Sequence, residues 1–152
     1  MKKSKWFILA LLVLGLDQVT KIWAASTLLP YHANPMFPSF NLTLAFNGGA
    51  AFNFLSQTGS WHRWFFVGFS LLMSGVISVW ILRLPNTAKL KSLALAFILG
   101  GALGNLIDRA FYGYVIDFID VYYKNNHWPV FNLADTFICI GALLMLIDLV
   151  QE

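Results

Sequence analysis

Four aspartates lie close together in an otherwise very apolar chain, in the stretches GNLIDR (104–109), VIDFID (115–120) and FNLAD (131–135). An ionisable group costs about 3 kcal/mol to place at the centre of a membrane helix, so its presence there is a functional hypothesis by default. Two carboxyl groups held close together share one proton, because like charges cannot both ionise easily. Such a pair can activate water against an amide carbonyl while donating a proton to the carbonyl oxygen or the leaving amine. We therefore expect aspartic-protease chemistry in residues 104–135.

Asp117 and Asp135 are the candidate pair, but the residues alone leave alternatives open. Asp117 comes just after one predicted helix and Asp135 one turn into the next, so both carboxylates can face the same opening. Asp117 and Asp120 also fit solvated loop acids, and the pattern does not say which of them would be the partner of Asp135. Asn132 and Asp135 have the spacing of a helix N-cap and a first-turn acid, which stabilises a helix without catalysis.

Further polar residues have helical spacings that suit a supporting role. Asn105, Asp108 and Arg109 fall at positions i, i+3 and i+4, so they share one helix face. Asp17 and Lys21 lie four residues apart and can form an ion pair, which explains how an apolar helix tolerates both charges. Direct participation of this pair in substrate binding is the alternative. Asp108 can be neutralised by Arg109 or by Lys21.

The composition places these residues in a membrane protein. The 152 residues are 59% hydrophobic and 11% charged, with a mean hydropathy of +0.69, whereas charged residues make up about 25% of a soluble domain. We expect an all-α membrane protein that forms a single integral membrane domain over residues 1–152. The predicted transmembrane helices cover residues 6–25, 62–84, 90–111 and 131–150, and the extramembrane segments cover 26–61 and 112–130.

The segment between the first two helices contains a strand pattern. Apolar residues alternate with polar or small ones over residues 40–47, which is the period of a half-buried strand. Asn47-Gly48-Gly49 supplies a turn, and residues 51–54 can return as a second strand. We therefore expect a small extracytoplasmic β-sheet between helices 1 and 2, at the membrane surface.

The distribution of lysine and arginine predicts the orientation in the membrane. Basic residues precede the first helix and fill the connection between the second and third, whereas segments 26–61 and 112–130 contain only Lys124. The positive-inside rule then puts both termini in the cytoplasm and the aspartates toward the extracytoplasmic face. The net charge of +3 needs no nucleic-acid partner, because the basic residues are thinly spread and lie mainly at helix ends.

The sequence offers little for other kinds of site. The single cysteine, Cys139, excludes an internal disulfide and any CxxC motif. His32, His62 and His127 lack the spacing of metal ligands, and there is no GxSxG motif or glycine-rich phosphate loop. We expect neither a metal nor an organic cofactor.

The chain resembles the bacterial lipoprotein signal peptidases, also called type II or prolipoprotein signal peptidases, over nearly its whole length. The resemblance rests on DQVTK (17–21), NGGAAFNF (47–54), GGALGNLIDR (100–109), VIDFID (115–120) and FNLAD (131–135). It implies a multi-pass enzyme of the bacterial inner membrane that cuts diacylglyceryl-modified prolipoproteins just before the lipidated cysteine. The implied partners are these precursors and membrane lipid, and we expect a monomer.

The resemblance also implies roles for individual positions. Asp117 and Asp135 match the catalytic aspartates of the family, whereas Asp120 has no catalytic counterpart. Asn47 and Arg109 are expected to contact the substrate backbone, and a small sheet and a loop are expected over the site. The supporting polar positions are Asp17, Lys21, Asn47, Asn105, Asp108, Arg109 and Asn132.

Two other classes of function fit the same residues. A small proton-coupled carrier would also place aspartates and an arginine in a helical bundle, although carriers usually have internal repeats or broken helices, and the sequence has neither. A non-catalytic membrane scaffold would use the GxxxG pair Gly100 and Gly104 for helix packing, and it would tolerate the loss of both aspartates.

Overall fold

Four long helices dominate the protein. The computed structural model describes residues 3–49 and 61–151. Each helix is long and apolar enough to cross a membrane, and the predicted all-α membrane fold with a small antiparallel sheet is confirmed. Their ends lie within two residues of the predicted ones, as expected for helix boundaries. The helices are α1 (Ser4–Thr27), α2 (Trp61–Arg83), α3 (Lys89–Phe111) and α4 (Leu133–Gln151).

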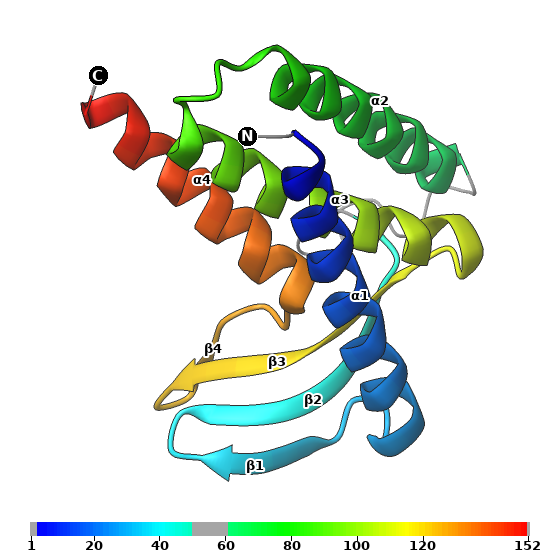
Figure 1. Cartoon of the computed structure of the whole chain (residues 1–152). Helices are drawn as coiled ribbons and strands as arrows, with labels where there is room; N and C mark the ends of the chain where they lie inside the picture. The colour runs from blue at the N-terminus through cyan, green and yellow to red at the C-terminus, as the bar shows by residue number, and fades with distance from the viewer. Residues whose placement is uncertain (1–2, 50–60, 152) are drawn as a thin grey trace.

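Helix α3 is the centre of the bundle and packs against the other three helices (Figure 1). Glycines permit the close approach: a Cβ added at Gly100 would lie 2.6 Å from the backbone oxygen of Ala10 in α1. On the other side, a Cβ at Gly141 of α4 would lie 2.7 Å from the backbone oxygen of Ala94. These glycines therefore let helix backbones come together, which is the usual role of small residues in membrane bundles.

The outer helix faces are apolar and exposed. Half of the most apolar window of α3 is buried within the protein, against 11% of the corresponding window of α4. Leu72 of α2 and Leu146 of α4 are each 60% exposed or more. Apolar surface of this extent needs a partner, and lipid is the natural one for helices of this length.

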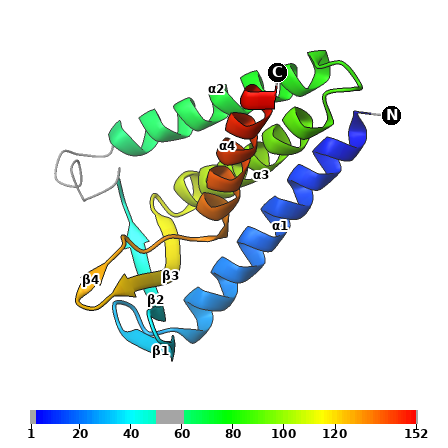
Figure 2. The same ribbon diagram turned by 90° about the vertical axis from the view of Figure 1, so that its left-hand side faces the viewer.

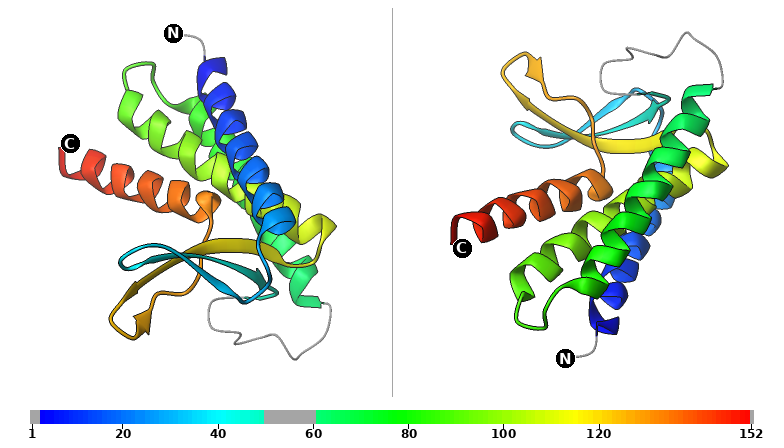
Figure 3. Two further views of the ribbon diagram at one scale, coloured as in Figure 1. Left: turned by 90° about the horizontal axis from the view of Figure 1, so that it is seen from below. Right: turned by 90° about the horizontal axis from the view of Figure 1, so that it is seen from above.

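A four-stranded antiparallel sheet lies at one end of the bundle, where α1 ends and α4 begins (Figure 2). The start of α1, the connection between α2 and α3, and the end of α4 lie at the opposite end. Figure 3 shows β3 crossing the end of the bundle, from the end of α3 past the start of α4. In spatial order the strands are β1 (Ala33–Phe37), β2 (Phe40–Asn47), β3 (Val115–Tyr123) and β4 (Asn126–His127).

The sheet is larger than the sequence suggested, because the segment between α3 and α4 contributes two strands. β2 pairs with β1 on one side and with β3 on the other. The VIDFID stretch is therefore a central strand rather than a loop, and Asp117 and Asp120 are buried rather than solvated. The predicted second strand at 51–54 lies outside the described residues. A buried apolar cluster of Ala24, Leu44, Ile116 and Phe118 joins the sheet to the end of α1.

Candidate active site

A cavity of about 840 Å³ lies between the sheet and the start of α4. Asp117 from β3 and Asp135 from α4 both line it. Residues three apart on a strand point to opposite faces, and Asp120 is not among the lining residues in the described part of the chain. The structure thus brings the two candidate catalytic aspartates together and separates Asp120 from them.

Two side-chain amides hold Asp117 at the edge of the cavity. Its side chain is almost wholly buried: Asn132 Nδ2 donates to its Oδ1 at 2.7 Å, and Asn47 Nδ2 donates to its Oδ2 at 3.3 Å. Burial and the nearby charge of Asp135 raise the pKa of Asp117 from 3.8 to about 7, although the two amide hydrogen bonds and the charge of Lys21 oppose this rise. Asp117 can therefore carry a proton near neutral pH.

Asp135 is the third residue of α4, and its backbone takes part in the helix cap. Its N–H donates to Asn132 Oδ1 at 2.9 Å, which is the usual bond of an asparagine N-cap. Its own Oδ1 accepts a hydrogen bond from Asn105 Nδ2 at 2.8 Å. The capping predicted from the sequence is therefore present, but Asn132 performs it and leaves the Asp135 carboxylate directed at the cavity.

Two asparagine side chains connect the two aspartates. Asn132 is fully buried, and besides Asp117 its Nδ2 lies 3.2 Å from Asn105 Oδ1. Asn105 in turn donates to Asp135. The chain of contacts runs from Asp117 through Asn132 and Asn105 to Asp135, so the two carboxylates belong to one hydrogen-bonded network.

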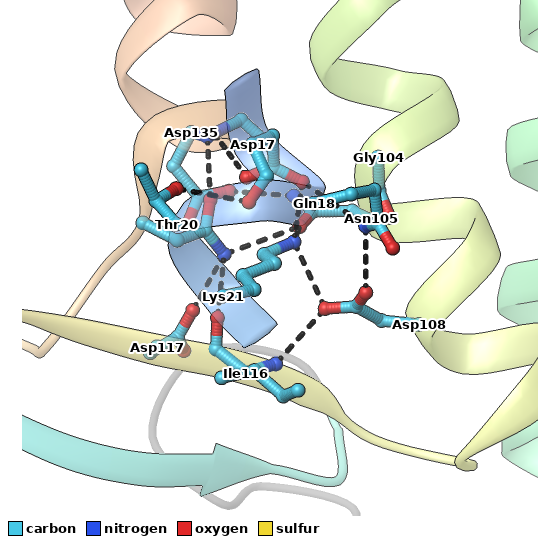
Figure 4. A network of polar contacts seen from close by, with 12 residues as sticks. Asp17, Gln18, Thr20, Lys21, Gly104, Asn105, Asp108, Ile116, Asp117 and Asp135 are labelled. Carbon is cyan, nitrogen blue, oxygen red and sulfur yellow. Dashed lines mark hydrogen bonds and ion pairs between the residues drawn. The ribbon is translucent and has the colours of Figure 1, made fainter. Parts of the chain in front are cut away.

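A second polar cluster lies beside this pair and is centred on Lys21 (Figure 4). Its Nζ lies 2.9 Å from Asp17 Oδ2, 2.9 Å from Asp108 Oδ2 and 2.9 Å from Asn105 Oδ1. An ammonium group has three donors, so all of them find acceptors. The predicted pair of Asp17 and Lys21 is confirmed, and Asp108 is neutralised by Lys21 rather than by Arg109.

The carboxylates of this second cluster also hold backbone groups in place. Asp17 Oδ1 accepts from the Ala134 N–H at 2.9 Å, and Asp108 Oδ2 accepts from the Ile116 N–H at 3.0 Å. Gln18 Nε2 donates to Asp108 Oδ1 at 2.9 Å. The cluster therefore fixes the residues next to both candidate catalytic aspartates. Gln18 was not predicted from the sequence, and its position next to Asp17 was the only signal.

Arg109 lines the cavity and brings a positive charge to it. Among the described residues it forms no ion pair, although its guanidinium lies 5.4 Å from the centre of the Phe66 ring. Arg63 of α2 supports the same turn, because its Nε donates to the backbone oxygen of Arg109 at 3.0 Å and its Nη2 to that of Ala110 at 2.6 Å. Arg63 thus caps the C-terminal end of α3, where a cation suits the helix dipole.

Asp120 lies in a third cluster, away from the cavity. It is buried and accepts hydrogen bonds from Asn41 and Thr43 of β2 and from His127 of β4. Residues 3–49 and 61–151 contain no group of three His, Cys, Asp or Glu side chains arranged to hold a metal ion.

The chain is similar to known proteins over most of its length. A family model described as "Signal peptidase (SPase) II" matches residues 9–151. A lipoprotein signal peptidase of Serratia proteamaculans is 46% identical over 144 residues, which are 95% of this chain and 85% of the relative. One of Acinetobacter baumannii is 51% identical over 144 residues, which are 94% of this chain and 81% of that protein.

A solved structure agrees with these relatives. A bacterial membrane enzyme solved by the in meso method at 1.9 Å resolution matches with a TM-score of 0.85 and 30% sequence identity. The match covers 98% of this chain and 94% of the solved chain.

Proposed function

Because this chain belongs to the signal peptidase II family, we propose that it is an aspartic endopeptidase in which Asp117 and Asp135 activate the water that cleaves a prolipoprotein. The family removes signal peptides from prolipoproteins in the bacterial inner membrane. One observation carries the proposal: the two carboxylates reach one cavity from different elements and are linked through Asn105 and Asn132.

The raised pKa of Asp117 assigns the roles of the two carboxylates in this proposal. Asp117, with a pKa of about 7, is the acid of the pair. Asp135, which accepts a hydrogen bond from Asn105 at 2.8 Å, is then the base. The longer of the two amide contacts of Asp117 is to Oδ2, which makes this oxygen the better place for the proton.

The proposed reaction follows from this assignment. Asp135 takes a proton from water while the water oxygen attacks the scissile carbonyl carbon, and Asp117 donates its proton to the carbonyl oxygen. The tetrahedral intermediate then breaks the carbon–nitrogen bond as Asp135 donates its proton to the leaving amine and a hydroxyl of the intermediate returns a proton to Asp117. The products are a carboxyl group on the signal peptide and a free α-amine on the lipidated cysteine, and the pair again holds one proton.

The cavity also offers groups for holding the substrate. Arg109 and Asn47 line it and can donate to carbonyl oxygens of an extended peptide. Cys139 and Ile140 line the cavity from α4 and are exposed on the outer face of the bundle. In this proposal the acyl chains of the substrate stay in lipid beside α4 while the scissile bond reaches the aspartates, and the apolar walls keep the pair poorly solvated.

The proposed orientation puts the sheet and the cavity at the extracytoplasmic face. Lys3 precedes α1, Arg83 ends α2 and Lys89 begins α3. These helix ends lie at the end of the bundle that is opposite the sheet (Figure 2). The positive-inside rule assigns that end, and with it both termini, to the cytoplasm.

The test is the cleavage of a synthetic precursor peptide carrying a diacylglyceryl cysteine, compared with the same peptide without the lipid. The purified protein in lipid nanodiscs should cut only the lipidated peptide, and mass spectrometry should place the cut directly before the modified cysteine. Equal cleavage of both peptides would contradict lipid recognition. No cleavage of either, together with proton flux in liposomes, would favour a carrier.

A further inference from the structure

The Asp120 cluster closes a connection between three strands. Asn41 Nδ2 and Thr43 Oγ1 of β2 donate to Asp120 Oδ2 at 3.0 and 3.1 Å, and His127 Nδ1 of β4 lies 2.7 Å from Asp120 Oδ1. Burial by itself raises the pKa of Asp120, but the hydrogen bonds from Asn41, His127 and Thr43 outweigh it and hold that pKa below 3.8. Asp120 is thus an ionised acceptor, and its hydrogen bonds are stronger than those between neutral groups.

Strand β4 needs such a contact, because it contains only Asn126 and His127. Its register pairs Tyr122 with His127 and Tyr123 with Asn126, and a two-stranded ribbon this short is not stable by itself. The His127 ring stacks on that of Tyr122 with centroids 5.0 Å apart. The bond to Asp120 is therefore the hydrogen bond that ties the β4 side chain to the buried part of the sheet.

The residues that directly follow β4 line the cavity. Residues 128–131, which we call the wall, all line the cavity that holds Asp117 and Asp135. Trp128 is 70% exposed, so packing does little to hold it, and its N–H donates to the Val121 backbone oxygen at 2.8 Å.

The far end of the wall is anchored separately. Phe131 exchanges backbone hydrogen bonds with Ile119, at 3.0 Å for the Phe131 N–H and 2.8 Å for the Ile119 N–H. A loss of the β4 contact should therefore loosen Trp128 and leave Asn132 and Asp135 in place.

We propose that Asp120 and His127 are positioning residues that hold the wall at the cavity and thereby strengthen substrate binding, without taking part in the bond-breaking step. This inference rests on the proposed function for its effect on the substrate. The ordering of the wall itself is independent of any reaction.

Two substitutions of His127 separate the hydrogen bond from the ring. His127→Phe keeps an aromatic ring against Tyr122 but removes the donor, whereas His127→Asn removes the ring but can place an amide donor near the position of Nδ1. The His127 side chain is 52% exposed, so neither variant should prevent folding. Asp120→Asn removes the charge from the other partner.

We expect His127→Phe to raise KM for the lipidated peptide by about tenfold, the value of one good hydrogen bond to a charged group, while kcat changes less than twofold. His127→Asn should restore most of the lost affinity. Asp120→Asn combined with His127→Phe should raise KM by less than the product of the two single effects, because both variants weaken the same contact. An unchanged KM in His127→Phe, a fall in kcat alone, or the same KM in the Phe and Asn variants would overturn the proposal.

Hydrogen exchange of the Trp128 amide gives the readout that needs no cleavage. It should exchange faster in His127→Phe than in the unmodified protein, while the Phe131 amide keeps its protection. Unchanged exchange at Trp128 would overturn the positioning role even if the chain proved to be no peptidase. If the Trp128 amide exchanges faster in His127→Phe but the unmodified protein cuts no peptide, the positioning role of His127 is supported and the proposed function is rejected.

Discussion

Two of the polar clusters at the end of the bundle use the same residue type in opposite ways. Around Lys21, two aspartates share one ammonium group, and their carboxylates also accept backbone N–H groups at the starts of α4 and β3. Around the cavity, Asp117 and Asp135 have only amide donors as direct partners among the described residues. We call the first cluster compensated because an ammonium group contacts both of its carboxylates. We call the second uncompensated because, in the described part of the chain, no cation forms an ion pair with its aspartates, although Arg109 lines the same cavity.

This difference suits the Lys21 cluster to a structural role and the Asp117 and Asp135 pair to acid–base chemistry. A buried carboxylate with a cation partner stays ionised and stabilises only the intact arrangement. Asp117 is buried and Asp135 partly buried, with no cation in direct contact among the described residues, so like-charge repulsion favours sharing one proton, the state that acid–base catalysis would require. Asn105 belongs to both clusters, since its Oδ1 accepts from Lys21 and its Nδ2 donates to Asp135. The compensated cluster thus helps to position Asn105, which contacts the candidate catalytic Asp135.

The largest expected effect comes from removing one carboxylate of the uncompensated cluster. Asp117→Asn or Asp135→Asn should each lower the cleavage rate by at least about 100-fold to 10,000-fold, since one of the two proton transfers is lost. Stability should hold or rise, because the repulsion between the two carboxylates is removed. The measurements are cleavage of the lipidated peptide and thermal unfolding in the same detergent.

Asp148→Asn is the matched control for these variants. It makes the same chemical change on α4, where Asp148 lies 3.0 Å from Lys91 and does not line the cavity. It should keep the unmodified cleavage rate. Retained cleavage in Asp117→Asn or Asp135→Asn would remove the distinction between the two clusters.

The opposite change, removing the cation from the compensated cluster, should act on stability. Lys21→Met leaves the carboxylates of Asp17 and Asp108 buried without their partner, and the exposure of Lys21 is only 1%. The expected cost is about 3–5 kcal/mol of unfolding free energy, measured by titration with a denaturing detergent. Adding Asp108→Asn to Lys21→Met should recover part of it. A cost below about 1 kcal/mol for Lys21→Met would contradict the structural role of this ion cluster.

The sequence predicted the helices well but not the strand that carries half of the candidate pair. Hydropathy and length suffice for a membrane helix, since lipid imposes both. β3 is buried on both faces from Val115 to Phe118, so the alternation that identifies a half-buried strand is absent. A run such as VIDFID then looks like a loop with two acids.

The partner of Asp135 could not be chosen from the sequence pattern either. Spacing could not distinguish Asp117 from Asp120, and only the resemblance to a family favoured Asp117. In three dimensions the alternation of side chains along β3 separates them, because one faces the cavity and the other the Asn41 side of the sheet. The contacts of Asn132 with Asp117 and Asn105, and those of Gln18, could not be predicted either, because they depend on which helices and strands meet.

The pH dependence of stability offers a subtler comparison between the clusters. The pKa of Asp117 is raised from 3.8 to about 7, so the folded state keeps a proton that the unfolded chain has lost. The stability due to this proton is complete below pH 3.8 and is lost as the pH rises to about 7. Denaturing-detergent titrations over this range should show stability falling with pH. The slope should be shallower in Asp117→Asn, and the cleavage rate of the unmodified protein should decline above about pH 7. An identical slope in both proteins would contradict the raised pKa.

The smallest expected effect tests how tightly the compensated cluster is packed. A Cβ at Gly104 would meet the Asp17 carboxylate and approach the Ala134 side chain, both of which are held by the ion cluster. Gly104→Ala should therefore cost about 1–3 kcal/mol by overpacking, although alanine favours a helix by up to about 1 kcal/mol. Gly15→Ala in α1 is the control, because its Cβ would meet nothing within 4 Å and only the helix preference remains. The two substitutions should shift the unfolding midpoint in opposite directions. Equal shifts would mean that Asp17 can move without loss, and that the ion cluster is held less tightly than its contacts indicate.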